Sequence, residues 1–106
     1  MNDYIIIQTT FATIEEAKKV IKILIDKRLV SCAQISNIES YYHWKNDVAH
    51  EPEFLVTLKT KENLYQKVEQ LIKDNHSYET PQIIAIPITK GSKEYLNWIK
   101  TETSGE

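Results

Sequence analysis

The sequence predicts one α+β domain over residues 1–106, a ferredoxin-like split βαβ in which an antiparallel sheet carries its helices on one face. The apolar pattern switches between strand and helix periods in the order βαββαβ, with a further helix at the C-terminal end. The length of 106 residues is that of a single domain. The second and third strands are also expected to form a long β-hairpin that extends from the sheet.

The first two elements are a buried strand and a capped helix. Residues 4–8 form a continuous apolar run, which is typical of a central strand covered by helix. Thr13 precedes Glu16 by three residues, as in a capping box that opens a helix. Apolar residues then recur at helical spacing, so we expect a helix over residues 14–28.

Two long strands are expected next, over residues 30–44 and 53–60, joined as a hairpin by a turn at 45–47. The first strand would span about 50 Å, whereas the preceding helix would span about 22 Å. The hairpin should therefore extend beyond the helix layer by about half its length. Its far end carries Tyr42 and Trp44, which we expect to anchor a contact with another subunit. The sequence thus predicts a homo-oligomer.

A second helix and a fourth strand follow. Residues 61–75 have an apolar stripe at helical spacing, and Thr60 is expected to be the N-cap. Residues 83–88 should form a strand. Pro87 cannot donate to a ladder, so it is expected near a strand end or at an edge of the sheet.

A short terminal helix is predicted after Ser92. Tyr95 and Trp98 lie on its apolar side at helical spacing, and we interpret them as core residues. The lone cysteine, Cys32, lies in a predicted strand and is also interpreted as a core residue. A single cysteine excludes an intramolecular disulfide and a Cys-based zinc cage.

Composition and charge exclude several classes of function. The 13 basic and 15 acidic residues give a net charge of −2, so there is no basic excess for nucleic acid and no polybasic stretch for a membrane surface. Two glycines cannot supply a Gly-rich phosphate loop. Apolar runs of about five residues are too short to span a membrane, and no signal peptide is recognised. We therefore expect a cytoplasmic protein.

Four motifs make the chain similar to a known family. They resemble, in order, the pattern of the CutA family, the divalent-cation tolerance proteins. The motifs are LVSCAQI at 29–35, SYYHW at 40–44 followed by Glu53 and LKT at 58–60, HSYETPQI at 76–83, and EYLNWI at 94–99. The resemblance implies a homotrimer of ferredoxin-like subunits, similar in architecture to PII signalling proteins, whose long hairpins wrap around neighbouring subunits.

The resemblance also implies copper or another divalent cation as a ligand, with none required for folding. The family's proposed copper ligands are a cysteine at the end of the first strand and a pair of histidines, and these positions match Gln8, Asn75 and His76. One imidazole alone is a weak site, so we expect weak copper binding that depends on His76. The alternative interpretation of His76 is a cation, or a carbonyl partner, at the helix C-terminus.

The polar residues within these motifs allow two interpretations. They form either an interface salt bridge or an intersubunit pocket for a small anion or metabolite. These residues are Glu53, Lys59, Tyr78 and Glu79. His43 and His50 flank the hairpin turn at a spacing that is not a recognised metal motif, so we interpret both as exposed.

Two functions remain open. The first is a non-enzymatic homotrimer that binds a divalent metal weakly and serves metal tolerance. The alternative is a PII-like sensor or scaffold that binds a small metabolite at clefts between subunits, with a protein partner that the sequence does not identify. An acylphosphatase-type enzyme would need a Gly-rich anion loop with an arginine, and residues 8–13 contain neither. We therefore expect no enzymatic activity.

Overall fold

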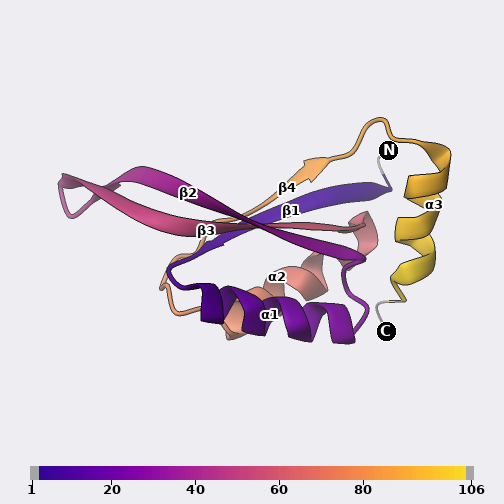
Figure 1. Cartoon of the computed structure of the whole chain (residues 1–106), viewed down its shortest axis with the longest axis horizontal. Coiled ribbons are helices and arrows are strands. Elements are labelled where there is room, and N and C mark those ends of the chain that lie inside the picture. Colours follow the sequence, from indigo (N-terminus) through magenta and orange to yellow (C-terminus); the bar gives the residue numbers. More distant parts are fainter. Residues whose placement is uncertain (1–2, 105–106) are drawn as a thin grey trace.

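A computed structural model describes residues 3–104, in which one antiparallel sheet has the strand order β2-β3-β1-β4. The elements are β1 (Tyr4–Phe11), α1 (Ile14–Asp26), β2 (Cys32–Trp44), β3 (Asp47–Lys61), a 3-10 turn (Glu62–Leu64), α2 (Tyr65–Asp74), β4 (Ile83–Pro87) and α3 (Lys93–Glu102). Helices α1 and α2 cover one face of the sheet, and α3 lies across one end of it (Figure 1). The predicted fold class is confirmed.

The core lies between the sheet and the two covering helices. Strand β1 is central, as predicted, but it continues beyond residue 8 because its register with β3 is maintained to the Phe11–Phe54 pair. Helix-facing side chains of the sheet and the apolar stripes of α1 and α2 are buried together. They are Ile5, Ile7, Phe11, Val56, Leu58, Ala17, Val20, Leu24, Val68 and Ile72.

The first helix is capped at both ends by its own sequence. The Thr13 hydroxyl accepts a hydrogen bond from the Glu16 amide at 3.2 Å, which confirms the predicted N-cap. The helix ends at Asp26 rather than at residue 28, because Arg28 adopts a left-handed φ of 55°. The Leu29 amide then bonds back to a carbonyl in the last turn, as in a Schellman motif.

Two boundaries around α2 also differ from the prediction. Thr60 does not cap the helix, because it is still part of β3 and its hydroxyl donates to the Leu29 carbonyl at 2.6 Å. A 3-10 turn at Glu62–Leu64 precedes the helix, which begins at Tyr65 and ends at Asp74. Strand β4 ends at Pro87 on an edge of the sheet, where a residue without an N–H is tolerated.

The interpretation of α3 as a source of aromatic core residues was wrong. Ser92 caps the helix by accepting from the Tyr95 amide, but only Ile99 of the helix is buried. Tyr95 and Trp98 are 40% and 41% exposed and stack on each other at 5.6 Å. The helix contacts the end of the sheet along a narrow stripe, so helical spacing alone does not bury its whole apolar side.

Strands β2 and β3 form a hairpin that extends beyond the helices, as the predicted lengths require (Figure 1). The turn contains only Lys45 and Asn46, both with positive φ, and Asp47 already pairs with Trp44. Strand β3 therefore begins at residue 47 rather than at residue 53. We call residues 39–52 the hairpin arm.

The arm leaves the chain more open than a compact monomer. Residues 41–48 are all exposed. The radius of gyration is 14.4 Å, against about 13 Å for a globular domain of this length. The accessible surface is 7019 Å², against about 6,100 Å² for a monomer of this mass. Both differences agree with the exposure of the arm, which α1 and α2 do not cover (Figure 1).

The sheet face opposite α1 and α2 carries exposed apolar side chains among polar ones; we call it the open face. Register places Ile6 of β1 beside Ile86 of β4, and Gln8 beside Ile84. Ile84 and Ile86 are 46% and 42% exposed. Cys32 lies on this face, opposite Lys59, and is partly exposed, so its interpretation as a core residue was wrong.

Candidate functional site

A buried carboxylate marks the foot of the hairpin arm. Glu53 is 8% exposed and accepts hydrogen bonds from the hydroxyls of Ser40 and Tyr78, each at 2.7 Å. Ser40 comes from β2 and Tyr78 from the loop after α2, so three separate segments meet at this side chain. Within residues 3–104, no basic side chain forms an ion pair with Glu53. The charge is held by neutral hydroxyl donors.

The tyrosines of this cluster are held in their neutral form. Burial raises the pKa of Tyr78 well above the ordinary tyrosine value, and the hydrogen bond to Glu53 and the Glu53 charge raise it further. The Tyr42 hydroxyl donates to Glu51, and this bond raises the pKa of Tyr42. Both phenols therefore act as donors to carboxylates at neutral pH.

The predicted polar set divides into two separate places. Glu53 and Tyr78 meet, but Lys59 lies six residues further along β3, about 20 Å away at the rise of a strand. The Lys59 ammonium instead donates to the Gln34 side chain at 2.8 Å and lies 5.7 Å from the ring centre of Tyr95. Glu79 is exposed in the loop. One chain alone therefore does not bring these residues together in a pocket.

His76 is a buried link between β1 and the loop after α2. Its side chain is fully buried, and its ring stacks on Phe11 at 4.4 Å. Its Nε2 lies 2.7 Å from the Thr10 carbonyl, which can only accept, so Nε2 carries the proton. Its Nδ1 accepts the Tyr78 amide at 3.1 Å, with Glu16 4.0 Å away.

These contacts do not fit a copper centre at His76. A metal bond needs an imidazole lone pair, and the Nδ1 lone pair is already used by the Tyr78 amide. Asn75, at the second inferred ligand position, donates its side-chain amide to the Leu71 carbonyl. Across residues 3–104 there is no group of three or more His, Cys, Asp or Glu side chains that could hold a metal ion. We therefore place no copper ion at this position.

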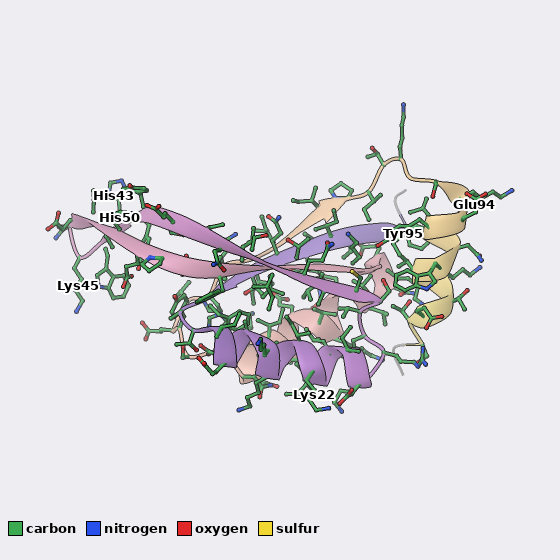
Figure 2. The ribbon with its side chains drawn as sticks, in the orientation of Figure 1. Lys22, His43, Lys45, His50, Glu94 and Tyr95 are labelled. Carbon is green, nitrogen blue, oxygen red and sulfur yellow. The ribbon has the colours of Figure 1, made fainter. Side chains whose placement is uncertain are left out.

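The register of the arm reveals a relationship that the sequence analysis missed. His43 pairs with Val48 and His50 pairs with Tyr41, so the two histidines lie on one face of the hairpin, with the Tyr42–Ala49 pair between their two pairs. Both are exposed, as predicted, and Figure 2 shows them near the tip. The predicted turn of three residues does not give this arrangement, because one extra turn residue shifts the register of β3 and moves one histidine to the other face.

Comparison with known proteins agrees with this architecture. A family model described as CutA1 divalent ion tolerance protein matches residues 5–102. The divalent-cation tolerance protein CutA of Pyrococcus horikoshii is 36% identical over 99 residues, covering 93% of this chain and 97% of the relative. The corresponding protein of Archaeoglobus fulgidus is 38% identical, covering 93% and 95%.

Solved structures give the same result. CutA1 from Oryza sativa superposes with a TM-score of 0.94 at 33% identity, covering 99% of this chain and 97% of that chain. The Archaeoglobus fulgidus structure, described as a periplasmic divalent cation tolerance protein, gives 0.91 at 36% identity, covering 93% and 97%. Among the described residues, no helix is long and apolar enough to cross a membrane.

Proposed function

The chain belongs to the family of CutA1 divalent ion tolerance proteins, and from this membership we propose that it serves the cellular response to divalent metal ions as a non-enzymatic, cytoplasmic homotrimer. The observation that supports the assembly is the exposure of Ile84 and Ile86 on the open face of the sheet. Soluble monomers rarely leave a large apolar surface uncovered. Here α1 and α2 cover only the opposite face (Figure 1).

The arm extends the same surface. Along β2 every second side chain points to the same face, and the side of the open face receives Ile38, Ser40, Tyr42 and Trp44. Tyr42 is 37% exposed and Trp44 is 59% exposed. If both aromatic residues are buried against a second copy of the chain, the arm and the sheet form one interface. Tyr42 and Trp44 are then its anchor residues, as proposed from the sequence.

Metal binding in this proposal is weak. A high-affinity site for a transition metal uses several nitrogen or sulfur ligands at once, and the described residues contain no group of three. The protein therefore exchanges its ion readily. A metabolite-binding sensor is not favoured by the geometry, because Lys59 and Glu53 do not converge within the chain.

The assembly is tested by light-scattering mass after size exclusion, with and without EDTA. We expect the mass of three chains in both conditions. Ile84→Lys places a charge on the open face and should give a smaller, folded species. Ile25→Lys is the matched control, because Ile25 is 39% exposed on α1, away from that face. A monomeric wild-type protein, or equal masses for the two variants, would contradict the proposed interface.

The cellular role is tested separately. Cells that lack the protein should grow less well at raised concentrations of a divalent cation, and the wild-type chain should restore growth. Unchanged tolerance to copper, zinc, nickel and cobalt in such cells would remove the basis for the proposed role.

A further inference from the structure

The outer face of the hairpin arm gathers nitrogen and oxygen ligands that lie apart in the sequence. Along this face the Tyr41–His50 rung lies between the Glu39–Pro52 rung and the His43–Val48 rung. Side chains of neighbouring rungs on one face are diagonal neighbours, with Cα atoms about 7–8 Å apart. His50 therefore has Glu39 on the side of the domain body and His43 on the side of the turn.

The ring of His50 is held in a defined orientation although it is exposed. It stacks on Tyr41 with centroids 4.0 Å apart and planes 5° apart. Its Nε2 lies 2.8 Å from the Glu39 carboxylate. An ionised carboxylate only accepts, so the proton of the neutral ring is on Nε2 and the lone pair is on Nδ1. His76 differs, because the Tyr78 amide already occupies its Nδ1.

This arrangement is the one that metal-binding histidines use. A ligating imidazole commonly donates its other N–H to a carboxylate, which fixes the tautomer and makes the ligand nitrogen more basic. The two nitrogens of an imidazole face nearly opposite ways, so the Nδ1 lone pair of His50 lies on the side of the ring away from Glu39. The neighbouring rung on that side carries His43.

We propose that His43 and His50 form a two-imidazole site for a divalent first-row transition metal, with Glu39 as the residue that positions His50. Imidazole ligands suit copper, nickel and zinc, and Cu²⁺ has the highest affinity of the divalent series for a given site. Water completes the coordination, which agrees with the lack of a three-residue group in the described part of the chain. This inference rests on the proposed role in metal response and gives it a location.

The site remains accessible in the proposed assembly. His43 and His50 occupy the face of the arm opposite to Tyr42 and Trp44, because side chains alternate along a strand. An interface built from the open face and its aromatic extension leaves the histidine face to solvent. Each subunit would thus carry its own site near the end of its arm.

The test is calorimetric titration of Cu²⁺ into the full chain, together with electron paramagnetic resonance of the copper-loaded protein. The wild-type spectrum should show coupling to two imidazole nitrogens. His43→Gln and His50→Gln should each weaken binding more than tenfold, and Glu39→Gln, which keeps both ligands, by about tenfold. Asp47→Asn is the matched control, because it removes a carboxylate from the tip on the opposite face.

The outcomes separate this inference from the proposed function. If the His43→Gln/His50→Gln double variant binds Cu²⁺ as the wild type does, the arm site is overturned while metal binding by the protein stands. A loss confined to His50→Gln overturns the two-imidazole arrangement. A wild-type protein that binds no Cu²⁺, Ni²⁺ or Zn²⁺ overturns both. Circular dichroism checks the fold of each variant, and all four substituted side chains are exposed.

Discussion

The hydroxyl of Tyr78 donates to the buried carboxylate of Glu53 at 2.7 Å, and this bond ties the loop after α2 to the foot of the hairpin arm. The two residues are 25 positions apart in the sequence. The same tyrosine provides the backbone amide that bonds to His76. Tyr78 therefore connects the covered face of the sheet to the strand that leads into the arm.

Tyr78→Phe should lower the free energy of unfolding by about 1–3 kcal/mol, because it leaves a buried carboxylate with one hydroxyl donor fewer. Denaturant unfolding at neutral pH measures the change. Tyr95→Phe removes a hydroxyl from a ring that is 40% exposed and should change the stability by much less. Equal effects of the two substitutions would show that the bond to Glu53 adds nothing to stability.

The ionisation of Tyr78 should be displaced to high pH. Its pKa is raised above the ordinary value of 10.0, first by burial and then by Glu53. A raised pKa in the folded state means that this residue stabilises the protein below pH 10, and that the contribution is lost as the pH rises further. Titration of ¹³C-labelled tyrosine by NMR should show Tyr78 ionising last. Glu53→Gln should lower the pKa of Tyr78, although not to the ordinary value, because the burial remains.

His76→Asn should reduce stability without reducing copper binding. The substitution removes the ring stacked on Phe11 and leaves the Thr10 carbonyl and the Tyr78 amide without their partner. A loss of about 2 kcal/mol is expected from unsatisfied buried groups. Unfolding and Cu²⁺ titration are measured on the same preparation.

His43→Asn is the counterpart, because its side chain is exposed. It should leave the unfolding free energy almost unchanged and weaken copper binding. If copper binding is lost in His76→Asn and retained in His43→Asn, then the buried His76 is the copper ligand and the arm histidine is not.

Lys45→Asn should stabilise the hairpin turn. Lys45 and Asn46 have φ values of 51° and 65°, the left-handed pair of a type I′ turn, in which asparagine is favoured over lysine. Relief of the left-handed lysine is worth about 1 kcal/mol, and part of this is offset by loss of the contact between Lys45 and the Trp44 ring. A lower thermal midpoint for the variant would contradict this interpretation of the turn.

The sequence predicts the fold well where a local pattern of residues is compatible with only one type of secondary structure. The apolar run at 4–8 and the Thr13 cap each have a local cause, and both are confirmed. Residues 47–52 were not predicted as strand, because they pair only with the exposed part of β2 and have no buried face to give a pattern. Tyr95 and Trp98 lie on the apolar side of α3, but tertiary packing decides how much of that side is covered.

The candidate sites were predictable only in part. Glu53 and Tyr78 were singled out from the motifs, and they do meet. The contact between His76 and Thr10 joins residues 66 positions apart, so no local sequence pattern predicts it. The placement of His43 and His50 on one face of the hairpin depends on a turn of two residues, and the choice between two and three requires the backbone geometry at Lys45 and Asn46.

The exposed arm also has a consequence for hydrogen exchange. A two-stranded ribbon without a covered face is marginally stable in water, so amides in residues 41–48 of an isolated subunit should exchange by local opening. Amides shared by β1 and β3 lie over the core and should exchange only when the domain unfolds. Slow exchange in the arm would then report contact with a neighbouring chain. Deuterium uptake by this one segment can therefore follow dissociation of subunits at concentrations too low for scattering.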